Sequence, residues 1–234
     1  MENRGKELME VEYIDHSGFT VETDHYFLIF DYFKGGLTIK QKPTIVFSSH
    51  HHGDHFNPEI LDWQKDHPQI HYVLGHDIEV EKQENRFFMA PCQKMTIGEI
   101  EIKSFGSTDE GISFLVRAEG KYIFHAGDLN WWHWSCDSRE DQLKAEDDFK
   151  GEISKIDKVP IDLAFFPVDP RLGDQYFWGG LYFIDQLRPK YFFPCHFGGN
   201  YEITRQFAGR VKEGRTRVMA IEKRNQVFVI KRDA

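Results

Sequence analysis

The sequence predicts a protein of the α/β or α+β class, built from many short strands and a few helices. Short apolar and aromatic runs recur along the chain in the patterns typical of strands. One charge-rich stretch has the periodicity of a helix. Several apolar runs end in histidine, aspartate or cysteine, which indicates that strand ends present a site.

The first half of the chain is expected to be rich in strands. They are predicted at residues 9–14, 18–23, 26–31, 43–49 and 100–105. The pair Asn57–Pro58 is a typical helix start and predicts a helix over residues 57–66. Residues 112–126 predict a hairpin that turns at residues 119–121.

The second half adds helices to the strands. From Ser138 to about Ile156 the pattern is helical and rich in charge, and a shorter helix is expected over residues 201–211. Buried strands are predicted at residues 161–169 and 189–196. Two further strands are expected to pair with each other through a turn, at residues 217–222 and 226–231.

The length and the charge of the chain limit the classes of protein to which it can belong. The 234 residues can bury a full core and are predicted to form one domain, residues 1–234. The formal net charge of -9 argues against non-specific binding to nucleic acid or to anionic membranes. The charged N-terminus does not resemble a signal peptide, and no apolar run approaches the roughly 20 residues that span a bilayer. Three widely spaced cysteines argue against a disulfide framework, so we expect a cytoplasmic protein.

The densest group of reactive side chains lies in the stretch SSHHHGDHFNP. In an extended segment, residues two apart project to the same side, so His50 and His52 can share one metal ion. His51 is then expected to point away. A solvated loop or an expression tag does not explain four histidines and an aspartate between a buried strand and a helix start. The pattern therefore favours a metal site.

The rest of this cluster and three other strand ends extend the predicted site. Gly53 eases a turn that lets Asp54 and His55 face a neighbouring ion. Other strands end in KYIFHAGD, DLAFFPVD and KYFFPCH. Because buried parallel strands hold their ends rigidly, ligands beyond them can converge on one point. These ligand types suit zinc, with manganese or iron as alternatives.

Three motifs carry a resemblance to a known family. HHHGDH resembles the His-x-His-x-Asp-His signature of the metallo-β-lactamase superfamily, YIFHAGD its Gly-Asp motif and FFPCHFG its C-terminal histidine motif. The likeness is nearest to the branch of short bacterial-type hydrolases that includes ascorbate-6-phosphate lactonase. It implies an α+β fold, a four-layer αββα sandwich with the site at one edge. It also implies one or two divalent metal ions, with Asp128 bridging two positions. The implied metal ligands are His50, His52, Asp54, His55, Asp128 and His196.

The chain departs from the superfamily pattern at one ligand. The superfamily normally supplies a further histidine between the first two motifs, where SFGSTDEGISFLV places Ser107, a poor zinc ligand. The open substitutes are His76, Asp109, Glu110 and His125. We therefore expect the second position to bind metal firmly and the first to bind it more weakly or to take a different metal.

Together these features predict a metal-dependent hydrolase with a small-molecule substrate. The expected substrate is an ester, lactone or phosphodiester, anionic or neutral, attacked by a metal-activated water. Asp54 is predicted to orient this water or take up its proton, and His133 to donate a proton. Asp31, at a strand end, either orients a ligand histidine or is an ordinary turn carboxylate. The sequence leaves the substrate, the metal count and the oligomeric state open.

Residues around the motifs have two interpretations each. The stretch DLNWWHWSCDS follows Asp128 directly, so its tryptophans form a wall for substrate or pack in the core. They are Trp131, Trp132 and Trp134. Arg171 either clamps an anionic group or pairs with Asp169. Cys195 is expected to be buried packing because no base is paired with it.

Two alternative functions are weighed against the hydrolase. HGDH also resembles the transfer-RNA-processing branch of the superfamily, but the acidic balance and the lack of a basic arm argue against a nuclease. The second alternative is a non-catalytic member that binds a metal or a ligand and has lost hydrolysis along with the missing histidine.

Overall fold

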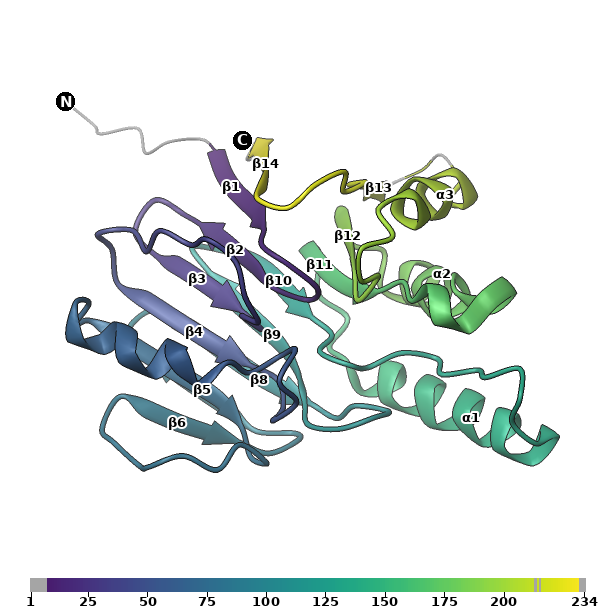
Figure 1. The fold of residues 1–234 in the computed structure, drawn as a ribbon, viewed down its shortest axis with the longest axis horizontal. Coiled ribbons are helices and arrows are strands. Elements are labelled where there is room, and N and C mark those ends of the chain that lie inside the picture. Colours follow the sequence, from purple (N-terminus) through teal and green to yellow (C-terminus); the bar gives the residue numbers. More distant parts are fainter. Residues whose placement is uncertain (1–7, 213, 215, 232–234) are drawn as a thin grey trace.

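Two seven-stranded sheets pack face to face in the computed structural model, which describes residues 8–212, 214 and 216–231 (Figure 1). The first seven residues of the charged N-terminal segment lie outside the described residues. In each sheet an antiparallel half adjoins a parallel half. Neighbouring parallel strands end at the same edge of their sheet, so the residues that follow them gather there.

The first sheet has the strand order β14-β1-β2-β3-β4-β5-β6. Strands β14 to β3 are antiparallel neighbours, and β3 to β6 are parallel. The strands are β1 (Leu8–Tyr13), β2 (Phe19–Glu22), β3 (Phe27–Phe30), β4 (Thr44–Ser48), β5 (Ile70–Gly75), β6 (Arg86–Met89) and β14 (Gln226–Lys231).

The second sheet has the strand order β13-β12-β11-β10-β9-β8-β7. Strands β7 to β10 are antiparallel, and β10 to β13 are parallel. The strands are β7 (Lys94–Ile97), β8 (Ile100–Phe105), β9 (Ser113–Ala118), β10 (Lys121–His125), β11 (Ile161–Pro167), β12 (Tyr191–Cys195) and β13 (Arg217–Val218).

Helices cover both outer faces, which completes the four layers implied by the resemblance (Figure 1). On the first sheet lies the 3-10 helix η1 (Pro58–Lys65), whose buried Ile60 belongs to one apolar cluster with Ile29 and Tyr72. On the second sheet Phe183 packs between Phe124 and Phe166. The remaining helices are α1 (Arg139–Lys155), the 3-10 helix η2 (Pro170–Gln175), α2 (Trp178–Leu187) and α3 (Glu202–Arg210).

An aromatic core joins the two sheets. Phe19 stacks on Phe165 with ring centroids 4.4 Å apart, and Phe47 meets Phe114 at 5.3 Å. All four rings are fully buried. Burial of each phenylalanine contributes about 2 kcal/mol, so this layer holds the sheets together and keeps their strand ends aligned.

Most predicted elements are confirmed. Ser138 caps α1 through its side chain, and the hairpin turns at Glu119 and Gly120, both with positive φ. The predicted pairing of residues 217–222 with 226–231 is wrong. β13 lies beside β12 in the second sheet. β14 pairs along its whole length with β1 in the first sheet, and these six residue pairs take the place of a short hairpin with β13.

The helix α2 has no counterpart among the predicted elements, for an identifiable reason. Its N-cap Phe177 makes no side-chain capping bond, and its first turn holds Gly179 and Gly180, which are poor helix formers. Tertiary packing requires both glycines. A Cβ on Gly179 would lie 2.1 Å from Asn130 Oδ1, and one on Gly180 2.7 Å from the Phe207 ring. None of the described helices combines the length and the apolar character needed to cross a membrane.

Three glycines from separate segments close around Ser49, just before the histidine cluster. A Cβ on Gly75 or Gly111 would lie 2.3 Å from Ser49 O, and one on Gly127 2.8 Å from Ser49 Cβ. Gly53, in contrast, has open space around it, and its φ lies outside the left-handed region. The backbone freedom of glycine is thus needed beside the cluster rather than within it.

We predict that Gly111→Ala destabilises the fold, because its φ of +73° and its contact with Ser49 O both exclude a methyl group. The expected loss in the free energy of unfolding is about 2 kcal/mol, measured by urea denaturation of metal-free protein. Gly53→Ala is the matched control and should change it little. Equal stabilities of the two variants would contradict this packing.

Candidate metal centre

The structure gathers strand ends from both sheets at one edge. In the first sheet, Asp31 follows β3 and residues 49–55 follow β4. In the second sheet, Asp128, Asp169 and His196 come just after β10, β11 and β12. The side chains therefore meet although they lie far apart in sequence.

Asp128 lies at the centre of the cluster and is only 4% exposed. Its Oδ2 atom lies 3.5 Å from His50 Nε2. Its Oδ1 atom lies 3.1 Å from His55 Nε2 and 3.4 Å from His196 Nε2. The two oxygens thus face different groups of histidines, an arrangement that suits a carboxylate shared by two metal positions.

His50 and His52 form the first pair of histidines, and His50 also lies in one candidate metal group with His55 and Asp128. His50 Nε2 and His52 Nδ1 are 3.1 Å apart, close enough to reach one ion. His51 turns outward as expected, and its Nδ1 lies 2.9 Å from Asp77 Oδ2 and 3.2 Å from Glu110 Oε2. With one oxygen of the shared aspartate, the first position has three candidate ligands.

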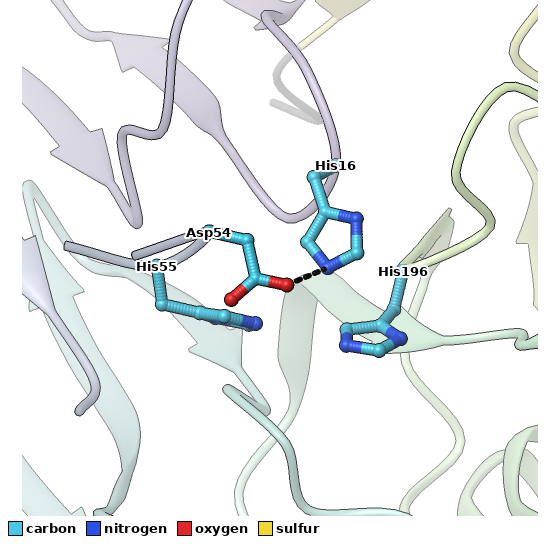
Figure 2. Close-up of side chains that lie close together, drawn as sticks. All are labelled: His16, Asp54, His55 and His196. Carbon is cyan, nitrogen blue, oxygen red and sulfur yellow. Dashed lines mark ion pairs between the residues drawn. The ribbon is translucent and has the colours of Figure 1, made fainter. Parts of the chain in front are cut away.

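The second group is larger than the sequence predicts, because it includes His16 (Figure 2). His16, Asp54, His55 and His196 each offer an atom within 4.8 Å of the others. His16 Nε2 lies 3.3 Å from Asp54 Oδ2, and the rings of His16 and His196 are 4.2 Å apart. Asp128 Oδ1 lies beside His55 and His196 and can add a fifth ligand to these four.

The turn between β1 and β2 holds His16 in place. Ile14 N donates to Gly18 O at 2.8 Å, and His16 itself has a φ of 53°. His196 N donates to His16 O, which ties this turn to the end of β12. The available signal for His16 in the sequence is the same as for the other ligands, a histidine directly beyond an apolar strand.

Buried atoms without hydrogen bonds show that the cluster fits a cation. Among the described residues, His16 Nε2, His55 Nε2 and Asp128 Oδ1 are buried and have no hydrogen-bond partner. His55 Nε2 and Asp128 Oδ1 lie 3.1 Å apart without forming a hydrogen bond. Burying unpaired polar atoms is costly, and a metal ion bound between them would satisfy all three.

The charges within the cluster shift its protonation. Burial would raise the pKa of Asp128, but His55 and the other histidines outweigh it and hold this pKa well below its usual range. Burial would lower the pKa of His55, but Asp128 and Asp31 raise it above its usual range. Burial and the adjacent imidazoles lower the pKa of His16 to about 3. A metal ion must therefore displace a proton from His55.

Asp31 orients the ligand loop, in agreement with one of its two interpretations. This carboxylate is fully buried and accepts from Ser49 N, from Ser49 Oγ and from His55 Nδ1, each at 2.7 Å. Ser49 Oγ also lies 3.0 Å from His50 Nδ1. Asp31 thus turns the Nε2 atoms of both histidines toward Asp128.

Asp169 supports His196 in the same way. Its Oδ2 lies 2.9 Å from His196 Nδ1. Arg171 donates from Nε and Nη2 to the same carboxylate, so the predicted pairing with Asp169 is present. Cys195 is fully buried, and burial raises the pKa of its thiol well above the usual range, in keeping with a packing role.

His125 is a hydrogen-bonded core histidine. Its Nε2 lies 2.9 Å from Ser17 O, and its Nδ1 accepts from Gly127 N at 3.1 Å. It is fully buried and stacks on Phe30. Both ring nitrogens are engaged, so His125 does not replace the missing ligand.

The other substitutes for the missing histidine do not join the first position. Glu110 Oε2 lies 3.7 Å from His52 Nε2, the ring nitrogen opposite the one that faces His50. Glu110 instead forms a more exposed candidate metal group with His51 and His52. The metal-type clusters found within the described residues include neither His76 nor Asp109.

The tryptophan segment alternates between two sides. Trp132 lies 5.6 Å from the ring of His196 and stacks on Trp134 at 5.8 Å, with an angle of 5° between the rings. His133 instead lies 4.7 Å from Trp178, and no ring contact or ion pair within the described part of the chain joins it to the histidine cluster. The structure does not bring the predicted proton donor to the cluster.

These features define a class: a two-sheet αββα sandwich with a candidate metal centre of histidines and carboxylates at one edge. The chain belongs to the β-lactamase superfamily, because the family described as the β-lactamase superfamily domain matches residues 10–134.

Individual proteins are similar to this chain in sequence or in fold. A protein of Opitutus terrae described as a UPF0173 metal-dependent hydrolase is 26% identical over 223 residues, covering 83% of this chain and 87% of the relative. The structure of a metallo hydrolase from Ignicoccus hospitalis matches with a TM-score of 0.66 and 18% identity, over 95% of this chain and 98% of the other. CmlA, a diiron β-hydroxylase of Streptomyces venezuelae, matches with a TM-score of 0.59 and 11% identity, over 95% of this chain and 54% of its own.

We predict that Asp31→Asn weakens both the fold and metal binding. An amide cannot accept all three hydrogen bonds, so the expected loss in the free energy of unfolding is about 3 kcal/mol. Zinc affinity should fall roughly 10- to 100-fold, measured by competition with a chromogenic chelator. Asp62→Asn, in an exposed pair with Lys65, is the control. An unchanged zinc affinity in Asp31→Asn would contradict the orienting role.

The raised pKa of His55 predicts how stability changes with pH in metal-free protein. Because the pKa of His55 is higher in the folded than in the unfolded protein, protonated His55 stabilises the folded state at low pH. This stabilisation is lost as the pH rises from 6.5 toward about 10. Urea denaturation should therefore show falling stability over this range. Asp128→Asn removes the main charged partner of His55, so the stability of this variant should fall less steeply with pH. Groups that titrate in the same way in both proteins do not affect the difference between them. Equal slopes would show that His55 is not the source of the fall.

Proposed function

We propose that this protein is a metal-dependent hydrolase that acts on a small ester, lactone or phosphodiester. The observation that carries the proposal is the placement of Asp128, whose Oδ2 faces His50 and whose Oδ1 faces His55 and His196. Membership of the superfamily supports it, as does the relative described as a metal-dependent hydrolase. A small molecule is the proposed partner, in keeping with the net charge of -9. The cytoplasmic location stays a prediction.

The two positions are proposed to differ in strength. The first would be held by His50, His52 and Asp128. The second would be held by the side chains of Figure 2 together with the other oxygen of Asp128. The second position should bind metal more tightly because it has more candidate ligands. In addition, the carboxylates of Asp31 and Asp169 orient two of its histidines.

The chemistry follows from this arrangement. A bound divalent metal supplies a Lewis acid and lowers the pKa of a coordinated water toward about 7. Asp54 is 44% exposed, so its carboxylate borders both the cluster and solvent and can orient water or accept its proton. Asp31 and Asp169 bind the Nδ1 atoms of His55 and His196, so the Nε2 atoms of both histidines face Asp128.

Zinc is the proposed metal. Manganese and iron share part of its preference for imidazole and carboxylate ligands. The mixture of imidazole and carboxylate ligands does not select one of them. A diiron protein is among the structures with a similar fold, which supports testing iron as well.

We predict that metal-free protein takes up zinc in two steps, a tight first equivalent and a weaker second. Metal content per chain, measured by mass spectrometry across a zinc titration, checks this. His16→Ala should weaken the first step and His52→Ala only the second. Ser107→His should tighten the second step by restoring a ligand. Two equal tight steps in the wild type would contradict the proposed difference.

The hydrolase itself is tested with nitrophenyl acetate, bis(nitrophenyl) phosphate and a simple lactone. At least one should be hydrolysed by metal-loaded protein, and Asp128→Asn should lower the rate by at least about 100-fold, because both positions share this carboxylate. Activity that survives both a chelator and Asp128→Asn would overturn the proposal.

A further inference from the structure

A small cavity lies beside the candidate metal centre, and the proposed hydrolysis leaves it without a role. Its volume is about 230 Å³, enough for a small molecule, and it is lined by Thr108, Asp109, Trp132, Trp134 and Arg171. Two contacts join it to the cluster: the ring of Trp132 lies 5.6 Å from that of His196, and Arg171 Nη2 lies 3.5 Å from His196 Nδ1.

The tryptophans give the cavity a flat apolar wall. Trp132 and Trp134 stack nearly parallel, and Trp132 Nε1 donates to Asp128 O at 3.0 Å. That bond fixes the indole relative to the backbone of the shared aspartate. Both rings are partly exposed although they pack against the core. Rigid indoles at a cavity suit the face of a planar or cyclic ligand.

Arg171 gives the cavity a fixed positive charge. Its Nε and Nη2 atoms bind Asp169, and its guanidinium lies 5.7 Å from the centre of the Trp134 ring. The side chain is nevertheless 61% exposed. No hydrogen bond from Nη1 is found within the described ranges, so this edge of the guanidinium can bind an anion.

Asp109 adds the opposite charge at another part of the wall. Its backbone N donates to Ser107 Oγ, whereas its carboxylate has no hydrogen bond or ion pair among the residues that the structure describes. Thr108 Oγ1 is already bonded to the backbone of Asn130. Arg171 is thus the lining residue that suits an anion. The carboxylate of Asp109 would repel the same anion.

We propose that this cavity is a substrate subsite that binds a carboxylate or phosphate group attached to a flat or cyclic body. Arg171 binds the anion and the two indoles cover the body, which places the rest of the molecule toward His196. This inference rests on the proposed function and adds the substrate class to it: an anionic ester, lactone or phosphodiester. Asp109 makes the cavity selective, because it repels an anion placed away from Arg171.

The experiment compares benzoate with benzamide, which has the same ring and shape but no charge, by isothermal titration calorimetry on metal-loaded protein. Benzoate should bind several-fold tighter than benzamide. Arg171→Gln should weaken benzoate about tenfold and leave benzamide nearly unchanged. Asp109→Asn should tighten benzoate about threefold by removing a like charge.

Further variants distinguish binding in this subsite from direct binding of benzoate to the metal. Trp134→Leu should weaken benzoate and benzamide alike, and Trp63→Leu, on η1, is the matched control. Because Arg171 also contacts Asp169, metal content is measured in every variant, and Asp109→Asn tests the charge without touching that pair. Benzoate that binds the metal directly would be insensitive to Asp109→Asn and Trp134→Leu, and this result would overturn the inference.

The outcomes also separate the inference from the hydrolase proposal. Equal affinities for benzoate and benzamide would overturn the subsite even if nitrophenyl acetate is hydrolysed. The expected sensitivities to Arg171 and Asp109, without hydrolysis of any tested compound, would support an anion site in a protein that does not hydrolyse them. In that case the hydrolase proposal fails and the subsite stands.

Discussion

The buried carboxylate of Asp31 is the interaction on which the candidate metal centre depends. It lies at the end of β3 and binds the backbone and side chain of Ser49 and the ring of His55. These bonds connect two neighbouring parallel strands at the edge where they end. Three glycines pack against the same serine and leave it no room to shift. The ligand loop after β4 is therefore held from both sides before any metal binds.

Asp128 would make the two proposed metal positions dependent on each other. Asp128 comes from the second sheet, whereas His50 and His55 come from the first, so a metal bound by them would join the two halves of the sandwich. The second position also draws His16 from the first turn of the fold and His196 from the end of β12. Ser107 stands where the superfamily pattern has a further histidine for the first position, so the two proposed positions are expected to differ.

The segment after Asp128 shows how one stretch can serve both core and site. Residues alternate along it, so Trp132 and Trp134 face the cavity and Arg171, whereas His133 packs against Trp178. Trp131 packs against Phe149 and Tyr182, whereas Trp132 and Trp134 line the cavity. The same alternation places His133, the proton donor predicted from the sequence, against Trp178.

The sequence by itself determined the fold class, the hairpin, most strands and the strand ends that carry ligands, because period-two patterns and strand-terminal histidines are local signals. Tertiary structure alone decided the rest. It added His16, whose nearest partners, Asp54 and His196, are remote in sequence. It also separated β13 from β14, formed α2 despite its glycines, and turned Glu110 to the outside of His52. Each of these depends on contacts between distant segments, and no local pattern encodes such contacts.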